Sequence, residues 1–236
     1  MTARQRALTA IGFDADDTLW RHEHYYRQTE DRLLALLADH SAPQDISLRL
    51  LEIERRNLPL YGYGVKGFTL SMIETAIETT QGRVSAEMIA EVLAAGRELL
   101  RHPIEVLPHA RDTLARLADD FQLILITKGD LFDQERKLEE SGLADFFDAV
   151  EIVSDKSAAT YARAFARYAD GAERAMMVGN SLKSDVIPAI EAGGWGVHVP
   201  YELTWAVERA EPPLSAPRFR QLPHLGELVE LVVAIS

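Results

Sequence analysis

The sequence predicts an α/β fold in which a doubly wound, Rossmann-like parallel sheet forms a core and an all-helical domain is inserted after the first strand. The first observation is that short apolar runs alternate with helical patterns after residue 104, which is typical of repeated βα units. The second is that residues 21–103 show helical periodicity and no segment typical of a strand. We therefore expect a core of residues 1–20 and 104–236 and a helical domain of residues 21–103.

The composition limits the classes of protein to which the chain can belong. It has 236 residues, 47% of them hydrophobic, which is enough for one sizeable domain or one domain with a modest insert. The formal net charge of -12 disfavours binding to nucleic acid, because basic patches supply most of that affinity. The absence of cysteine excludes disulfides, thiolate zinc sites and cysteine nucleophiles. No apolar run is long enough to span a membrane, so we expect a cytoplasmic protein without a membrane partner. We expect it to be a monomer or a homodimer.

Helical periodicity divides the insert into four helices. Leucine residues recur on a helical stripe in the first two, and Ser85 is expected to cap the last, with Met88 and Ile89 opening its apolar face. A loop over residues 58–67 separates the second helix from the third. The helices are expected at residues 25–40, 46–57, 69–80 and 85–101.

The remaining chain alternates between buried strands and helices. The strands are expected at residues 7–13, 121–127, 149–153, 175–178 and 195–199. The helices are expected at residues 108–119, 131–141, 158–168, 182–192 and 224–235. Gly142 is the expected stop of one helix, and residues 211–217 read as a proline-rich loop. Such alternation favours a parallel sheet that is covered on both faces.

The first apolar run ends in three carboxylates within four residues, Asp14, Asp16 and Asp17. Open parallel sheets bind ligands just beyond the carboxyl ends of their strands. Carboxylates that crowd together there repel one another unless a cation lies between them. For this stretch alone, the alternative is a solvated acidic turn in which Thr18 helps to start a helix.

The ends of the other strands add further polar side chains. Thr127 ends the second strand, Lys156 follows the third, and Asn180 and Asp185 follow the fourth. In a doubly wound sheet these positions can converge on one crevice. Carboxylates, a hydroxyl, an ammonium and an amide suit a dianionic phosphoryl group and one Mg²⁺ ion, which prefers oxygen ligands and keeps several waters.

These motifs, taken together, resemble those of the haloacid dehalogenase superfamily, most of whose members are phosphatases. The D-x-D-x-T pattern, with Phe13 before it and Leu19 after it, is similar to the signature of the family. The match covers about residues 7–199, with four motifs in the right order and each at a strand end. The inserted helices occupy the place where the family carries an α-helical cap.

The resemblance implies a role for each of the catalytic candidates. Asp14 corresponds to the nucleophile of the family and Asp16 to its general acid/base. Thr127 corresponds to the residue that holds a phosphoryl oxygen, and Lys156 to the lysine that neutralises charge on the nucleophile and the phosphate.

The resemblance also implies that Mg²⁺ is the cofactor. The metal ligands would be Asp14, Asp16 through its main-chain carbonyl, Asn180 and Asp185. Asn180 stands where the family usually has Asp, so the site has one negative charge fewer. Ser157 follows the lysine where the family usually has Pro, so this loop can run differently.

Three further residues are substrate-binding candidates beside Thr127 and Lys156. Lys128 stands where the family often has Asn and would add positive charge near the phosphate. Tyr63 and Lys66 lie on the glycine-flanked loop of the insert and would contact the leaving group. The alternative for this loop is a tight helix–helix connection with packed tyrosines.

The function that the resemblance implies is Mg²⁺-dependent hydrolysis of a small phosphorylated metabolite through an aspartyl phosphate. A phosphomutase shares the core, and no feature of the chain excludes it. A haloacid dehalogenase proper uses the same nucleophile but needs neither a metal nor the proton donor at Asp16. A non-enzymatic phospho-acceptor or binding module, as in response-regulator receivers, is the third alternative, although such a module is about half this length and lacks the insert.

Overall fold

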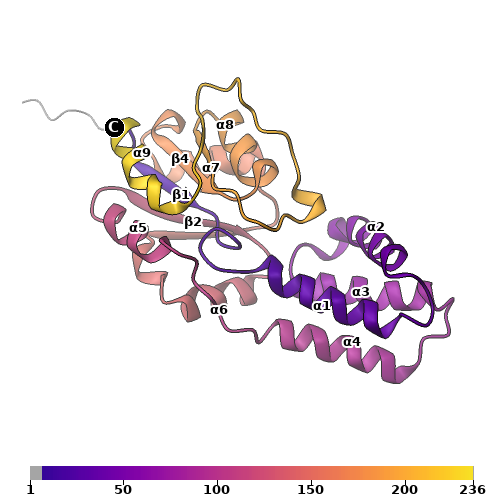
Figure 1. Cartoon of the computed structure of the whole chain (residues 1–236). Coiled ribbons are helices and arrows are strands. Elements are labelled where there is room, and N and C mark those ends of the chain that lie inside the picture. The colour runs from indigo at the N-terminus through magenta and orange to yellow at the C-terminus, as the bar shows by residue number, and fades with distance from the viewer. Residues whose placement is uncertain (1–6, 236) are drawn as a thin grey trace, which may run out of the picture. The chain divides into compact units, whose positions relative to one another are not determined.

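A six-stranded sheet forms the core of the computed structural model (Figure 1). Every neighbouring pair of its strands is parallel. The structure describes residues 7–235. The strand order is β3-β2-β1-β4-β5-β6. The strands are β1 (Ala10–Phe13), β2 (Gln122–Lys128), β3 (Ala149–Val153), β4 (Ala175–Gly179), β5 (Trp195–His198) and β6 (Phe219–Gln221). The helices that follow them are α5 (Ala110–Leu117), α6 (Leu131–Ser141), α7 (Ala158–Tyr168), α8 (Ile187–Glu191) and α9 (Leu228–Ile235). The predicted doubly wound α/β fold is confirmed.

The centre of the sheet is β1, which is buried along its whole length. Phe13, its last residue, is paired in register with Leu125 of β2 and Val178 of β4. The strand order reverses at β1, because β2 and β3 lie on one side of it and β4 to β6 on the other. The carboxyl ends of β1, β2 and β4 therefore lie side by side at the switch point, where open α/β sheets bind ligands.

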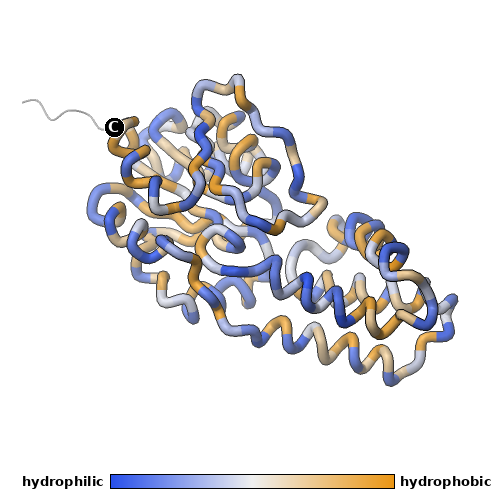
Figure 2. Tube along the Cα trace, in the orientation of Figure 1, coloured by the Kyte–Doolittle hydropathy of each residue, from blue (hydrophilic) through white to orange (hydrophobic). Residues whose placement is uncertain are grey.

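Side chains of β1 alternate between two hydrophobic clusters, because successive residues of a strand point to opposite faces of the sheet. Ile11 and Phe13 pack with residues of α5, α6 and α9, whereas Ala10 packs with residues of α7 and α8. Figure 2 shows the corresponding hydrophobic colour along the strands. Gly12 packs closely here, because a Cβ atom would lie 3.1 Å from both Ile126 Cδ1 and Met177 Sδ and these side chains would have to shift.

The described chain divides into two compact units. The unit that contains the sheet comprises residues 7–21, 104–128 and 135–235, and the helical unit comprises residues 22–103 and 129–134. The helices of the second unit are α1 (Glu23–Leu36), α2 (Pro43–Tyr61), α3 (Val65–Thr79) and α4 (Ala86–Leu99). They enclose a hydrophobic cluster of their own, which includes Leu33, Leu50, Met72 and Val92. The predicted outer bounds of the core, residues 1 and 236, lie outside the described residues.

Two details of the helical unit test local predictions. Ser85 caps α4 as predicted, since its hydroxyl accepts a hydrogen bond from the Met88 backbone N–H at 3.1 Å. The predicted loop over residues 58–67 is too long: α2 continues through Pro59 to Tyr61, and α3 begins at Val65. Proline usually breaks a helix interior, and here it is tolerated in the last turn. The connection is therefore short, and Gly62 and Gly64 both adopt positive φ angles within it.

The C-terminal half differs from prediction in two places. The single helix expected at residues 182–192 is a π-helical turn (Leu182–Val186) followed by α8, and Pro188 occupies the first turn of α8. β6 was not predicted, because its three residues are too few to show a strand period, and two of them are polar. Within residues 7–235, none of the helices combines the length and the hydropathy that a membrane crossing requires.

Candidate active site

Two carboxylates and one ammonium meet at the carboxyl end of the sheet. Asp14 follows β1, Lys156 follows β3, and Asp185 lies in the π-helical turn after β4. The Lys156 ammonium donates hydrogen bonds to Asp14 Oδ1 and, at 2.7 Å, to Asp185 Oδ1. All three residues are buried. The structure thus brings together three of the residues that the sequence predicts to form the site.

The charges of this cluster depend strongly on one another. Burial, followed by the neighbouring Asp185 carboxylate, raises the pKa of Asp14 to about 7, although Lys156 opposes this change. Burial lowers the pKa of Lys156, but Asp14 and Asp185 outweigh burial and raise that pKa above its usual value. Lys156 therefore remains a cation, whereas Asp14 requires nearby positive charge to stay ionised.

Thr18 connects this cluster to the loop after β4. Its hydroxyl donates to Asp14 Oδ2 at 3.0 Å and accepts from the Asn180 backbone N–H at 3.0 Å. The Thr18 hydroxyl oxygen is also 3.5 Å from Asn180 Oδ1. Asp17, with a φ of 60°, makes the tight turn that brings Thr18 back toward Asp14. The threonine of the D-x-D-x-T pattern therefore holds two loops together and does not start a helix.

The Asp16 carboxylate has partners of its own. Trp20 Nε1 donates to Asp16 Oδ1 at 2.7 Å, and Lys137 Nζ lies 2.7 Å from Oδ1 and 2.9 Å from Oδ2. Lys137 is buried and comes from α6. Sequence reasoning missed Lys137, because this part of α6 is rich in charged residues and resembles a solvated face. The sequence carries no clear signal for it, since the burial of its neighbours Leu138 and Ser141 is seen only in the folded chain.

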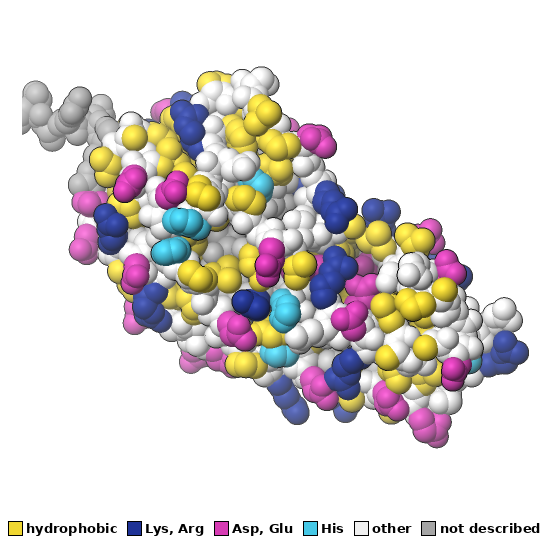
Figure 3. Space-filling view, in the orientation of Figure 1, with side chains coloured by type: hydrophobic (Ala, Val, Ile, Leu, Met, Phe, Trp, Pro, Cys, Tyr) yellow, Lys and Arg dark blue, Asp and Glu magenta, His cyan; other side chains and the backbone are white. Residues whose placement is uncertain are grey.

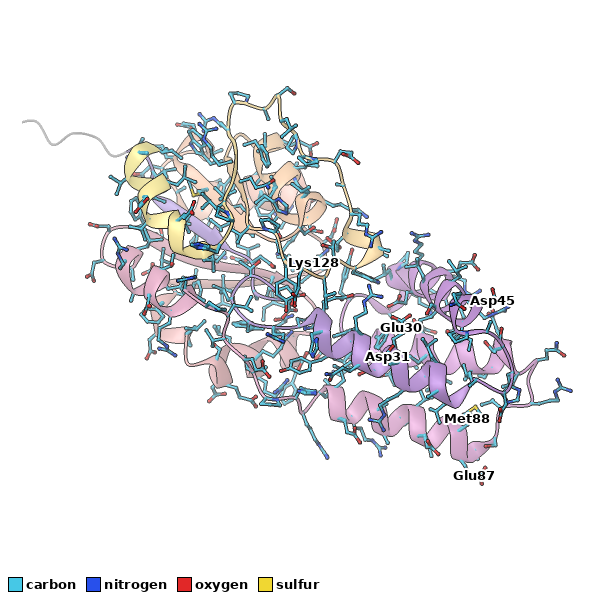
Figure 4. All side chains as sticks on the ribbon, in the orientation of Figure 1. Glu30, Asp31, Asp45, Glu87, Met88 and Lys128 are labelled. Carbon is cyan, nitrogen blue, oxygen red and sulfur yellow. The ribbon has the colours of Figure 1, made fainter. Side chains whose placement is uncertain are left out.

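Thr127 and Lys128 end β2, and Figure 4 labels Lys128. Thr127 is buried, and its hydroxyl makes a long 3.4 Å contact with the Lys128 carbonyl. Lys128 Nζ donates to Glu208 Oε1 at 2.8 Å and to Ser184 Oγ at 2.7 Å. Lys128 was expected to add a positive charge to the site. The Glu208 carboxylate, which was not considered, balances that charge.

The two candidates from the insert lie in the helical unit. Tyr63 stands between the glycines of the α2–α3 connection, and Lys66 lies in the first turn of α3. Lys66 Nζ donates to Asp130 Oδ2 at 2.8 Å, and its side chain is 62% exposed. The role of Tyr63 and Lys66 in substrate binding stays a prediction.

The donor atoms of the predicted ligands suit Mg²⁺. Carboxylate oxygens of Asp14 and Asp185, the Asn180 amide oxygen and the Asp16 carbonyl are hard oxygen ligands of the kind that Mg²⁺ prefers. Convergence of Asp14 and Asp185 on the Lys156 ammonium shows that both carboxylates face one cationic centre. Among residues 7–235, no group of three or more His, Asp or Glu side chains forms a metal cage. A site with two carboxylates suits an ion that retains several waters.

Comparison with known proteins agrees with this geometry. The model of the haloacid dehalogenase-like hydrolase family matches residues 8–193. The chain belongs to the haloacid dehalogenase-like hydrolase family. This hydrolase is 44% identical to a haloacid dehalogenase-like hydrolase from Xanthomonas campestris, whose crystal structure matches it with a TM-score of 0.88. The match covers 100% of this chain and 94% of that protein's chain.

Other proteins similar to this hydrolase include one named as a phosphatase and one named as a dehalogenase. The glyceraldehyde 3-phosphate phosphatase of Methanothermobacter thermautotrophicus is 27% identical over 84% of this chain and 88% of its own. A haloacid dehalogenase-family hydrolase from Bacillus subtilis, crystallised with magnesium, shares the fold at 18% identity and a TM-score of 0.66, over 97% and 99% of the two chains. A 2-haloacid dehalogenase from Pseudomonas syringae shares it at 22% identity and a TM-score of 0.60, over 97% and 100%.

Proposed function

We propose that this hydrolase cleaves small phosphomonoesters with the help of Mg²⁺ and through an aspartyl phosphate on Asp14. The observation that carries the proposal is that Lys156 donates to both Asp14 and Asp185 at the carboxyl end of β1. This arrangement offers a nucleophile, a permanent cation and a second carboxylate within one buried site. The phosphatase activity named for the archaeal relative supports the same reaction class.

In the first step, an Asp14 carboxylate oxygen forms a bond to phosphorus while the bond to the leaving alkoxide breaks. Lys156 and the Thr127 hydroxyl offset the charge that develops on the phosphoryl oxygens. Asp14, Asp185, Asn180 and the Asp16 carbonyl would hold Mg²⁺, which would supply further charge neutralisation and favour the ionised nucleophile.

Asp16 transfers the protons in both steps of the proposed mechanism. It gives a proton to the leaving alkoxide and then takes one from the water that hydrolyses the aspartyl phosphate. The Lys137 ammonium, 2.7 Å from Asp16 Oδ1, favours the ionised carboxylate and so suits the second step. The first step requires Asp16 to carry a proton.

Dehalogenation is the second candidate, because a 2-haloacid dehalogenase shares the fold. That reaction also begins with a carboxylate nucleophile, but it needs no proton donor and no metal. The phosphatase is favoured over the dehalogenase by the presence of a proton-donor candidate, Asp16, and of two metal-ligand candidates, Asn180 and Asp185.

A hydrolysis screen tests the proposal. Phosphorylated metabolites are incubated with the enzyme and Mg²⁺ and, in parallel, after exhaustive chelation; chloride release from 2-chloropropionate is measured alongside. We expect phosphate release from at least one small phosphomonoester, its loss on chelation, and no chloride release. Asp14→Asn serves as the inactive control. Metal-independent chloride release, or phosphate release that survives chelation, contradicts the proposal.

A further inference from the structure

Glu208 lies beyond the segment that the family model matches, yet its side chain reaches the loops of the active site. It ends a short 3₁₀ helix (Ala206–Glu208) in the chain between β5 and β6. Its Oε1 atom accepts from Lys128 Nζ at 2.8 Å, and its Oε2 atom accepts from the hydroxyls of Ser181, at 2.7 Å, and Ser184. Both carboxylate oxygens are thus engaged, and only 15% of the side chain is exposed.

The partners of Glu208 belong to the segments that carry the candidate metal ligands. Ser181 and Ser184 lie between Asn180 and Asp185 in the chain. The Ser181 backbone N–H donates to Asp185 Oδ2 at 2.9 Å, and the Ser181 hydroxyl accepts from the Ser184 backbone N–H at 3.0 Å. A continuous set of hydrogen bonds therefore runs from Glu208 through Ser181 to the Asp185 carboxylate.

Two further features show that this contact is built into the fold. Lys183, from the same π-helical turn, donates to the Val207 carbonyl at 2.7 Å, so the turn and the 3₁₀ helix are joined at a second point. Burial raises the pKa of Glu208, but the Lys128 ammonium and hydrogen bonds from Lys128, Ser184 and Ser181 outweigh burial and lower that pKa to about 2. Glu208 is therefore ionised at neutral pH and balances Lys128.

We propose that Glu208 is a positioning residue of the metal site, which holds the turn between Asn180 and Asp185 so that both residues face the same Mg²⁺ ion. This inference rests on the proposed function, because it assumes that Mg²⁺ binds there. Residues that orient metal ligands through hydrogen bonds commonly change metal affinity by about 10- to 100-fold when they are replaced. Glu208 contacts neither the substrate nor the nucleophile in this account, so its replacement acts on Mg²⁺ binding first.

Isothermal titration calorimetry with Mg²⁺ alone tests the inference without any assay of activity. We expect Glu208→Ala to raise the dissociation constant for Mg²⁺ by about tenfold or more. Glu208→Gln should lie between Glu208→Ala and the parent, because the amide keeps hydrogen bonds to the serines but lacks the charge that balances Lys128. Glu202→Ala, which removes an exposed carboxylate from the same C-terminal segment, is the matched control and should bind like the parent.

Steady-state kinetics adds a second measurement. We expect the Mg²⁺ concentration for half-maximal activity to rise in both Glu208 variants. If Glu208→Ala does not fold, as judged by its melting curve, Glu208→Gln decides in its place. Parent-like Mg²⁺ affinity in the folded variants overturns the positioning role alone. Absence of Mg²⁺ binding by the parent protein overturns the proposed function and this inference with it.

Discussion

Lys137 Nζ lies 2.7 Å from Oδ1 and 2.9 Å from Oδ2 of Asp16, and the Lys137 side chain is only 5% exposed. A nearly buried ammonium is costly unless it is paired, because it has lost its hydration. Asp16 is therefore the counter-ion of Lys137 as well as the proposed proton donor. This dual role affects how any Asp16 variant is interpreted.

A double-mutant cycle on this pair tests the structural role. We expect Asp16→Asn to lower the free energy of unfolding by about 2 kcal/mol, since it removes a carboxylate charge 2.7 Å from the buried Lys137 ammonium. Lys137→Met should also destabilise, whereas the combined variant should recover part of the loss, with a coupling energy of about 1 kcal/mol or more. Denaturant unfolding at neutral pH supplies the four values. Strict additivity of the two single changes would show that the pair is not coupled.

Asn180 offers a prediction about metal affinity. Asn180→Asp restores the negative charge that the family usually places there, and cation sites bind more tightly as the charge of their ligands increases. We expect the dissociation constant for Mg²⁺ to fall by about tenfold, and Asn180→Ala to raise it by a similar factor. Calorimetric titration measures both. Equal Mg²⁺ affinities for the Asp, Asn and Ala proteins would remove residue 180 from the set of ligands.

The buried carboxyl of Glu23, at the start of α1, predicts a pH dependence of stability. Burial raises its pKa from 4.5 to about 7, despite the Arg27 guanidinium 2.9 Å away. Between these values the folded state binds a proton that the unfolded state lacks, so the free energy of unfolding falls as pH rises. Glu23→Gln removes this pH-dependent loss of stability. The free energy of unfolding of the variant, relative to that of the parent, should therefore grow by up to about 3 kcal/mol from pH 4.5 to 8.

Urea unfolding at several pH values measures this difference. Glu30→Gln is the control, since it removes another carboxylate that contacts Arg27, 3.2 Å away. A constant difference between Glu23→Gln and the parent across this range would contradict the predicted titration.

Lys66 tests the predicted role of the α2–α3 connection in substrate choice. Lys66→Ala removes a cation, and Asp130→Asn breaks the same 2.8 Å ion pair but keeps that cation. If Lys66 binds the leaving group, KM or the ranking of substrates should change by about three- to tenfold for Lys66→Ala and little for Asp130→Asn. The ion pair is exposed, so we expect both variants to keep the stability of the parent within about 1 kcal/mol. Identical kinetic constants for Lys66→Ala and the parent would exclude Lys66 from substrate binding.

The fold and the centre of the site follow from patterns that are local in the sequence. The parallel core was predictable because each buried strand is a short apolar run, and polar residues mark where it ends. Asp14, Lys156 and Asp185 were predicted as site residues for the same reason, since each lies in the segment that follows such a run. The three residues of β6 were missed, because so short a segment shows no period.

The partners of these residues were harder to predict, because they come from distant segments. Glu208 follows β5 in a stretch without apolar periodicity, and only the folded chain shows that it reaches Lys128 and Ser181. Lys137 resembles its solvated neighbours on α6 until its contact with Asp16 is known. The π-helical turn at Leu182–Val186 was expected to be ordinary helix, since its wider hydrogen-bonding pattern leaves no clear mark in the sequence.

The central claim is that Asp14 carries the phosphoryl group during turnover, and one measurement tests it most directly. Asp16→Asn keeps this nucleophile but lacks the base that activates water, so the phosphoenzyme should accumulate with p-nitrophenyl phosphate, whose leaving group needs little protonation. For an alkyl phosphate the same variant should be slower than the parent by about 10²- to 10⁴-fold.

Mass spectrometry of the acid-quenched Asp16→Asn protein, taken from a sample whose melting curve shows that it is folded, locates the phosphate. The account predicts one phosphoryl group on Asp14 and none in a protein that also carries Asp14→Asn. Phosphate on any other residue, or hydrolysis by Asp14→Asn at the rate of the parent, would contradict it.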